Sequence, residues 1–331
     1  MDLTIVWAVL IAFAVAMYVV MDGFDLGIGI LFPGFTVGKE RDQAMNAIAP
    51  VWDGNETWLV LGGGGLLAAF PLAYAIILPA LYAPLTAMLL GLVFRGVAFE
   101  FRWRDPDHRR WWDAGFFGGS LVATFAQGVT LGALLQGIEV DGRAYGGGWW
   151  DWLTGFSLLT GISLVIAYAL LGACWLIWKT EGRIQADARR YAKFALPAMF
   201  VAVGLVSLWT PFLENQYYRR WFEFPGLIVT IPMPLLVAAA SWQLWRSLRR
   251  DVDWHPFLYA LALFALSLAG LGISMWPDVI PGRVSIWEAA APESSQLFML
   301  VGAAVLIPLI LAYTAWSYWV FRGKVGEEGY H

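Results

Sequence analysis

Residues 3–32 read LTIVWAVLIAFAVAMYVVMDGFDLGIGILF, and this stretch guides the interpretation of the whole chain. Its only charged side chains are Asp22 and Asp25, and about 20 mostly apolar residues are enough to cross a bilayer as a helix. A cleaved signal peptide has a basic start and a shorter apolar segment, whereas this run is long and follows Asp2. The stretch therefore predicts a retained membrane-spanning helix.

The composition extends this prediction to all 331 residues. Hydrophobic residues make up 60% of the chain and charged residues 14%, whereas an ordinary soluble domain has about 25% charged residues. One soluble core of this size could not enclose so many apolar side chains. The balance of 21 Lys and Arg against 25 Asp and Glu also excludes a nucleic-acid binder, which needs a basic excess. We expect an all-α, polytopic membrane protein, because lipid provides no water for unpaired backbone groups.

Nine apolar runs are long enough to span a membrane. They cover residues 3–32, 58–77, 82–101, 114–138, 156–178, 194–212, 224–245, 257–276 and 296–321. We interpret residues 1–331 as a single transmembrane domain, with spans 1–4 at about 3–138, spans 5–8 at about 156–276 and span 9 at about 296–321. The connections between the runs are too short to hold a second domain.

The basic residues predict the orientation of the chain. The connections after spans 1, 3, 5 and 7, together with the C-terminal tail, hold 16 of the 21 Lys and Arg residues, and the opposite face holds four. The remaining one, Arg95, lies inside a span. Because Lys and Arg concentrate on the cytoplasmic side, the N-terminus is expected outside and the C-terminus in the cytoplasm.

The chain offers few ligands for a cofactor. Its histidines are His108 in a basic loop, His255 at a helix start and His331 at the last position, and its single cysteine is Cys174. Haem iron usually takes axial His or Met ligands, and a zinc or iron–sulfur site needs clustered Cys and His. We therefore expect no cofactor or metal to be bound by this chain, and we interpret Cys174 as an inert core residue.

Charged side chains at membrane depth are costly and usually functional. Six of them map toward the predicted cytoplasmic face, namely Asp22, Asp25, Asp53, Glu56, Arg95 and Glu100. Asp22 and Asp25 share a helix face because they are three residues apart. Arg95 is expected to face Asp25 or Asp53 as a counter-charge, whereas Glu100 points in another direction and is also expected to find its partner on another helix. The functional interpretation is an acidic cluster that collects and relays protons.

Structural interpretations of the same residues stay open. Asp53 followed by Glu56 resembles a helix N-cap with its capping box. Asp22 would then be an interfacial acid, and Glu100 would only mark the end of its helix.

Two further features are interpreted as structural. Four glycines, residues 62–65, permit close helix contact at the start of span 2. On the opposite face, Ser294 or Ser295 is expected to cap span 9.

Motifs in a fixed order carry a family resemblance. They are MDGFDLGIG at 21–29, APVWDGNETWL at 49–59, FRGVAFEFR at 94–102, WEA at 287–289 with SSQL at 294–297, and LAYTAW at 311–316. With them the chain resembles subunit II of the cytochrome bd-type quinol oxidases, including their cyanide-insensitive relatives. The resemblance covers essentially the whole chain, and its specific motifs lie in the first hundred and last fifty residues.

The resemblance implies a terminal oxidase of the bacterial inner membrane that oxidises quinol and reduces dioxygen to water. It implies that a partner, subunit I, carries two haems b, one haem d and the quinol-oxidation loop. Subunit II would be haem-free, with two four-helix bundles and a peripheral ninth helix. Some members also hold a structural quinone against subunit II.

The resemblance also suggests roles for individual residues. Asp53, in the Trp-Asp-Gly-Asn motif, corresponds to a member of a proton path from the cytoplasm. Trp58 resembles a tryptophan that lines an oxygen route at the subunit interface. Glu56 stands where other members can have an amide, which alters the wiring of the path. The predicted proton path comprises Asp53, Asp25, Glu100, Asp22 and Glu56, with Arg95 as their charge partner.

Two other classes of function fit the residues. A proton-coupled transporter working alone would suit the intramembrane acids, although transporters more often place their sites near the midplane. A purely structural membrane scaffold is the third alternative. For the oxidase, the expected partners are subunit I and membrane lipids, small single-helix accessory subunits stay open, and the chain alone is not expected to be catalytic.

Overall fold

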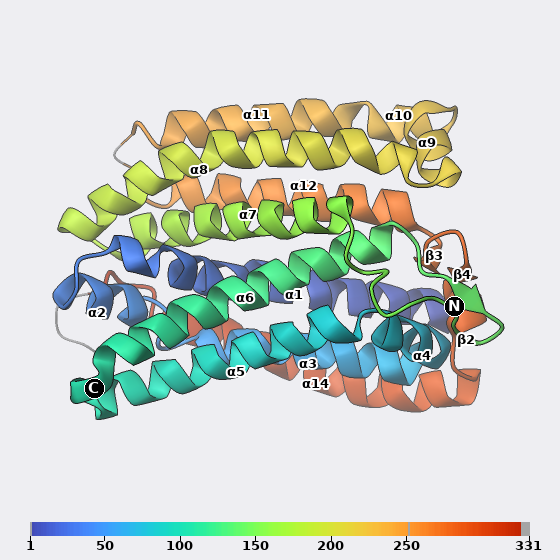
Figure 1. The fold of residues 1–331 in the computed structure, drawn as a ribbon, viewed down its shortest axis with the longest axis horizontal. Helices are drawn as coiled ribbons and strands as arrows, with labels where there is room; N and C mark the ends of the chain where they lie inside the picture. The colour runs from blue at the N-terminus through green and yellow to red at the C-terminus, as the bar shows by residue number, and fades with distance from the viewer. Residues whose placement is uncertain (1, 251, 326–331) are drawn as a thin grey trace.

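The computed structural model describes residues 2–250 and 252–325, and it consists mainly of long helices that run side by side (Figure 1). The long helices are α1 (Leu3–Leu31), α3 (Trp52–Ala69), α5 (Tyr82–Arg104), α6 (Arg109–Leu135), α7 (Gly155–Lys179), α8 (Gly182–Trp209), α11 (Pro232–Ser247), α12 (His255–Met275) and α14 (Glu293–Val320). Within the described residues, eight helical segments are long and apolar enough to cross a membrane. The prediction of an all-α, polytopic membrane protein is confirmed.

Short elements fill the connections. They are η1 (Phe32–Gly34), α2 (Lys39–Asn46), α4 (Pro71–Ala80), η2 (Pro106–His108), η3 (Thr210–Phe212), α9 (Asn215–Phe222), α10 (Gly226–Thr230) and α13 (Ile286–Ala289). Two antiparallel strand pairs also occur: β1 (Val140–Asp141) pairs with β2 (Ala144–Tyr145), and β3 (Asp278–Ile280) pairs with β4 (Val284–Ser285).

The second predicted span, residues 58–77, is not one continuous helix. It is divided between α3 and α4, and Phe70 between them has φ −130° and ψ 61°. The residue before a proline is disfavoured in the α conformation, and Pro71 lacks the N–H that would continue the helix. α3 is not among the eight apolar segments, so nine continuous spanning helices are not what the described residues form.

The start of α14 also differs from the prediction. The helix begins at Glu293 with Pro292 at the N-cap position, and no side chain caps it. The prediction that Ser294 or Ser295 caps this helix is wrong, because both already lie within its first turn. The buried Gln296 fixes this end instead, since its side-chain amide donates to the carbonyl of Ala291 at 2.8 Å.

The basic connections meet at one end of the helices, which we call the basic end. There Arg183 lies 3.2 Å from Glu40, and the side chain of Gln43 donates to the carbonyl of Val325 at 3.0 Å. The N-terminus lies at the opposite end, with the two strand pairs (Figure 1). Trp287 in α13 donates to Asp2 there at 2.8 Å. The basic residues of α2, the α5–α6 turn, the α7–α8 turn and the C-terminal tail therefore share one end.

Glycines let the central helices approach one another closely. A Cβ atom added at Gly27 of α1 would lie 1.8 Å from the carbonyl oxygen of Tyr168 in α7. Gly91 of α5 and Gly119 of α6 oppose each other in the same way. The acidic residues at the end of α1 are consequently surrounded by packed helices, and Asp22 and Asp25 are fully buried.

Candidate functional site: a buried ion cluster at the basic end

Arg95 of α5 gathers three carboxylates from two other helices. Its Nη1 lies 2.6 Å from Oδ1 of Asp22 and 3.0 Å from Oε1 of Glu56, and its Nη2 lies 3.8 Å from Oδ2 of Asp25. The side chains of Arg95, Asp22 and Asp25 have no exposed surface, and that of Glu56 is 26% exposed. Arg95 therefore faces Asp25 as predicted, and we call these four residues the Arg95 cluster.

A second residue of α3 and one residue of α14 complete the surroundings of Asp25. Asn55 of α3 donates from its amide nitrogen to Asp25 at 2.7 Å and to the carbonyl of Met21 at 3.3 Å. Tyr318 of α14 donates its hydroxyl to the oxygen of the same amide at 2.9 Å. The cluster is thus linked from α1 through α3 to α14, although the sequence pattern singled out neither Asn55 nor Tyr318 for this contact.

A polar chain continues from the cluster toward the middle of the bundle. Tyr18 precedes Asp22 by one helical turn and shares its face of α1. Its hydroxyl accepts a hydrogen bond from Gln127 of α6, and Tyr168 of α7 donates to the same Gln127 side chain at 3.1 Å. These groups extend the polar region between α1, α6 and α7.

Asp53 and Glu100 lie outside the Arg95 cluster. Asp53 is exposed, near the start of α3, where the N-cap residue is Val51 and no side chain caps the helix. The capping box considered for Asp53 and Glu56 is therefore wrong, because Glu56 turns toward Arg95 instead. Glu100 is exposed and lies 3.7 Å from Arg104 of the same helix, so within the described chain its expected partner on another helix is not found.

Trp58 is buried inside the chain. It is 1% exposed and packs edge-on against Phe13 of α1, with ring centroids 5.7 Å apart. It lies two residues beyond Glu56 along α3, on the side that packs against α1.

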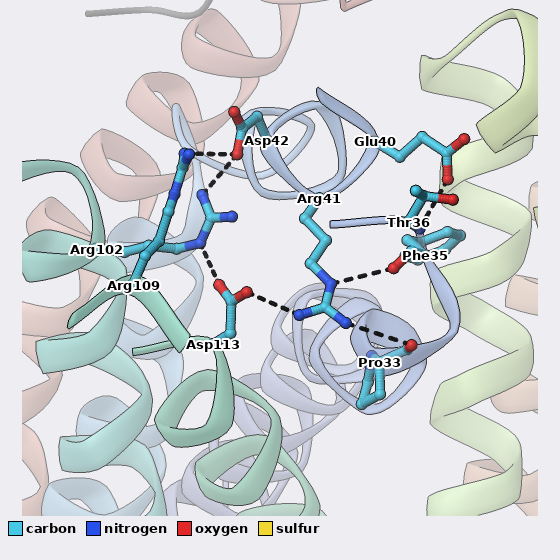
Figure 2. Close-up of polar contacts among 9 residues, drawn as sticks. All are labelled: Pro33, Phe35, Thr36, Glu40, Arg41, Asp42, Arg102, Arg109 and Asp113. Atoms are coloured by element: carbon cyan, nitrogen blue, oxygen red, sulfur yellow. Dashed lines mark hydrogen bonds and ion pairs between the residues drawn. The ribbon is translucent and has the colours of Figure 1, made fainter. Parts of the chain in front are cut away.

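A second ion network lies nearer the surface of the basic end (Figure 2). Buried Arg102 of α5 is 2.5 Å from Asp113 and 2.8 Å from Asp42. Arg109 also binds Asp42, at 2.7 Å, and Arg41 binds Asp113 at 2.8 Å. The network ties α2 to the hairpin of α5 and α6.

The sequence interpretation missed this network and treated its arginines only as orientation signals. The available signal was the presence of Asp42 and Asp113 among basic residues, since acids contribute little to membrane orientation. Arg41 also donates to the backbone carbonyls of Phe35 and Pro33, at 3.1 and 3.5 Å (Figure 2). These contacts fix the connection between α1 and α2, which follows the helix that carries Asp22 and Asp25.

The described histidines and the cysteine are placed as the sequence suggested. His108 is exposed and hydrogen-bonds to Asp105 at 3.0 Å, and His255 begins α12. Cys174 is fully buried in α7, and His331 lies outside the described residues. The two described histidines lie at helix ends and do not fit an axial pair for a haem inside this bundle.

The fold and the cluster together define a class: a polytopic membrane protein that encloses several carboxylates around one arginine toward one end of its helices. A family model described as cytochrome bd terminal oxidase subunit II matches residues 3–321. The chain belongs to this family. It is one subunit of a terminal oxidase, and its position as the second subunit implies a partner subunit I.

Individual relatives agree with this assignment. The chain is 30% identical to cytochrome bd-I ubiquinol oxidase subunit 2 of Escherichia coli (strain K12), over 98% of this chain and 96% of the relative. It is 31% identical to cytochrome bd ubiquinol oxidase subunit 2 of Bacillus subtilis (strain 168), over 97% and 96%. The bd oxidase structure from Geobacillus thermodenitrificans shares its fold, with a TM-score of 0.80, 15% identity and coverage of 97% and 99%.

Proposed function

We propose that the chain is the haem-free subunit II of a bd-type quinol:oxygen oxidase in the bacterial inner membrane. It would support subunit I, which would carry two haems b and haem d, while quinol is oxidised and dioxygen is reduced to water. The family assignment supports the oxidase, and the scarcity of histidine supports a haem-free subunit. In this proposal α3 and α4 together make the second of nine crossings, in two four-helix bundles and a peripheral ninth helix, and the basic end faces the cytoplasm.

The Arg95 cluster is the observation that carries the proposed proton path. Its three carboxylates and single guanidinium would leave two negative charges unbalanced if every acid were ionised. Burying unbalanced charge is very unfavourable, so the cluster favours holding at least one proton. A buried group that exchanges a proton with water at one membrane face is suited to feed oxygen reduction in the partner.

The path we propose runs from the surface inward. Exposed Asp53 takes a proton from the cytoplasmic side, half-buried Glu56 passes it on, and Asp22 and Asp25 hold it beside Arg95. Glu100 is a further acid at the rim of the path. Proton uptake from the inside, combined with release from quinol outside, would make the reaction electrogenic. We also propose that Trp58 borders an apolar oxygen route.

The outward face of α3 is the surface that we propose for subunit I. Asp53 and Thr57 are exposed on α3, and a Cβ atom added at Gly63 or Gly64 would meet nothing within 4 Å. Polar side chains are unfavourable against lipid. Small residues allow the helix of another subunit to approach closely. By contrast, α14 exposes mainly large apolar side chains, such as Phe298.

Replacement of the path acids tests the proton role. We expect Asp53→Asn and Asp25→Asn to slow turnover and charge separation in proteoliposomes by about 10²-fold or more, because a positioned proton carrier contributes about that much. Asp107→Asn, an exposed acid at the same end, is the matched control and should leave both rates unchanged. Unchanged turnover and charge separation in Asp25→Asn complexes that keep their haem spectrum would disprove the proton path.

A spectrum of the mildly solubilised protein tests the oxidase assignment against a transporter acting alone. The oxidase predicts that a second subunit co-purifies with haem absorption. A colourless single chain that moves a solute with protons would instead support the transporter.

A further inference from the structure

A cavity lies at the basic end beside Tyr318, which is linked to the Arg95 cluster through Asn55. Its walls come from the segment between α2 and α3, the end of α7 and the end of α14, and they include Asn46, Val51, Trp175, Lys179 and Tyr318. It encloses about 70 Å³ that the centres of water molecules can occupy. By that measure one water needs about 10–15 Å³, so the cavity has room for several waters.

The polar atoms on its walls suit water. The side-chain oxygen of Asn46 is buried, and no group among residues 2–250 and 252–325 hydrogen-bonds to it. Lys179 donates to the carbonyls of Phe321 and Gly323, the latter at 2.7 Å, and an ammonium has three donors. A free acceptor and an ammonium donor among the lining residues match water, which both donates and accepts, whereas an anion such as a lipid phosphate would leave Asn46 unsatisfied.

The inner wall connects the cavity with the Arg95 cluster. The hydroxyl of Tyr318 donates to Asn55, and Asn55 donates to Asp25. Because Asn55 also donates to the carbonyl of Met21, its amide is held with the oxygen toward Tyr318. The Tyr318 oxygen still has lone pairs for a cavity water, and Oδ1 of Asp25 has no hydrogen-bond partner within the described part of the chain.

We propose that this cavity is a second proton inlet to Asp25, distinct from Asp53 and bounded at its inner end by Tyr318, which hydrogen-bonds to Asn55. The inference rests on the proton role proposed above for the Arg95 cluster. A hydrated proton in the cavity transfers its proton to the carboxylate of Asp25, which becomes a carboxylic acid. The donor is left as neutral water, which exchanges with water at the basic end. Tyr318 and Asn55 keep their own protons and act as positioning residues.

The test compares variants of the whole oxidase in proteoliposomes. Asn46→Leu removes the free acceptor and makes the cavity wall apolar, and Tyr318→Phe removes the inner hydroxyl. In an Asp53→Asn background, where the other inlet is closed, each should slow the remaining proton-linked charge separation roughly tenfold or more while quinol reduces the haems at the normal rate. Asn46→Asp keeps an acceptor oxygen and should retain most of the rate of charge separation that Asn46→Leu loses. Tyr313→Phe, on an exposed part of the same helix, is the matched control and should have no effect.

Water access can be measured independently of turnover. Val51→Cys places a thiol on the cavity wall, and we expect a small charged thiol reagent to label it from the cytoplasmic side. The native Cys174 is fully buried, so the reagent should label the parent chain only weakly. A Val51→Cys chain that assembles but stays unlabelled overturns the inlet.

The outcomes separate this inference from the function on which it rests. If Asp25→Asn stops charge separation but Asn46→Leu and Tyr318→Phe leave the remaining rate of the Asp53→Asn complex unchanged, the inlet is overturned and the proton path stands. If Asp25→Asn itself has no effect, the proton path fails and the inlet fails with it.

Discussion

Arg95 illustrates how much depends on one side chain. It is fully enclosed and is the only basic residue of the Arg95 cluster. Removing one partner of a buried ion pair leaves an uncompensated charge and costs about 3–5 kcal/mol. We therefore expect Arg95→Gln to lower the thermal midpoint of the solubilised complex strongly, or to prevent its assembly.

Arg104→Gln provides the comparison on the same helix. Arg104 is exposed and pairs only with exposed Glu100, and exposed pairs contribute little to stability. The thermal midpoint should stay close to that of the parent. Equal stability of Arg95→Gln and the parent complex would contradict the structural importance of the buried arginine.

The sequence predicted the membership of the Arg95 cluster better than its geometry. Charges at membrane depth identified Arg95, Asp22, Asp25 and Glu56, because their burial demands a reason. Their pairing could not be deduced, since it depends on the rotation of three helices about their axes. Asp53 was expected beside them but is exposed, because it lies in the first turn of α3, nearly one turn closer to the basic end than Glu56.

At the level of elements, the contact of α1 with α7 should be highly sensitive to side-chain size. A Cβ atom at Gly27 would overlap the backbone of Tyr168, and forcing extra atoms into a packed core costs about 1–3 kcal/mol or more. Gly27→Ala should lower the yield and thermal midpoint of the complex. Gly204→Ala in α8, where an added Cβ meets nothing within 4 Å, should match the parent, and equal behaviour of the two variants would refute the close contact.

The C-terminal tail should respond to acid. Partial burial raises the pKa of the Asp253 carboxyl, but the hydrogen bond and charge of Lys324 lower it more, so the pKa lies below the ordinary value of 3.8. A depressed pKa in the folded state gives stability that is complete above the unfolded value and is lost as the pH falls through the folded one. The tail should therefore be tethered at neutral pH and released below about pH 3.8.

The backbone amide of Val325 donates to the backbone carbonyl of Lys179 at 2.7 Å. Its hydrogen-exchange protection therefore measures how firmly the tail is held. Asp253→Asn should lower its protection at pH 7 by up to about 1 kcal/mol, as expected for a partly exposed pair. In this variant the protection of the Val325 amide should also no longer change with pH below about pH 4. A parent protein whose protection is flat from pH 3 to 7, after correction for intrinsic exchange, would rule out the acid release.

The elements themselves were largely predictable from hydropathy. Long apolar runs identified the spanning helices, whereas the break at Phe70 was missed because the run of residues 58–77 is apolar on both sides of it. Pro71 was the available signal, since it disfavours the helical conformation of the preceding residue. The prediction of a serine cap for α14 failed for a related reason, because Pro292 already defines where that helix starts.

At the scale of the whole molecule, the outward face of α3, with its exposed polar and glycine residues, is the surface proposed to bind subunit I. Gly64→Trp would add a large side chain to a face where the chain itself leaves open space. We expect it to weaken association with subunit I by about 1–3 kcal/mol, measured as haem recovered per chain. Gly204→Trp in α8 is the matched control, and haem loss of equal size in both variants would contradict the proposed face.

The arrangement of the whole chain was predicted in outline. The uneven distribution of Lys and Arg indicated which connections share a face, and the structure brings those segments together at the basic end. The pairing of Arg102 with Asp42 could not be foreseen, because it joins α5 to α2, and the position of α2 depends on how the long helices pack.

The bond between Tyr318 and Asn55 also has a consequence for biosynthesis. The two residues are 263 positions apart, and a ribosome adding about 5–20 residues per second needs on the order of 10–50 s to cover that distance. During this interval the acids of α1 have entered the bilayer, but their last neighbour has not been translated. A nonsense codon anywhere before position 318 would leave that side of Asp25 open, and we expect membrane proteases to recognise such a chain as unfinished.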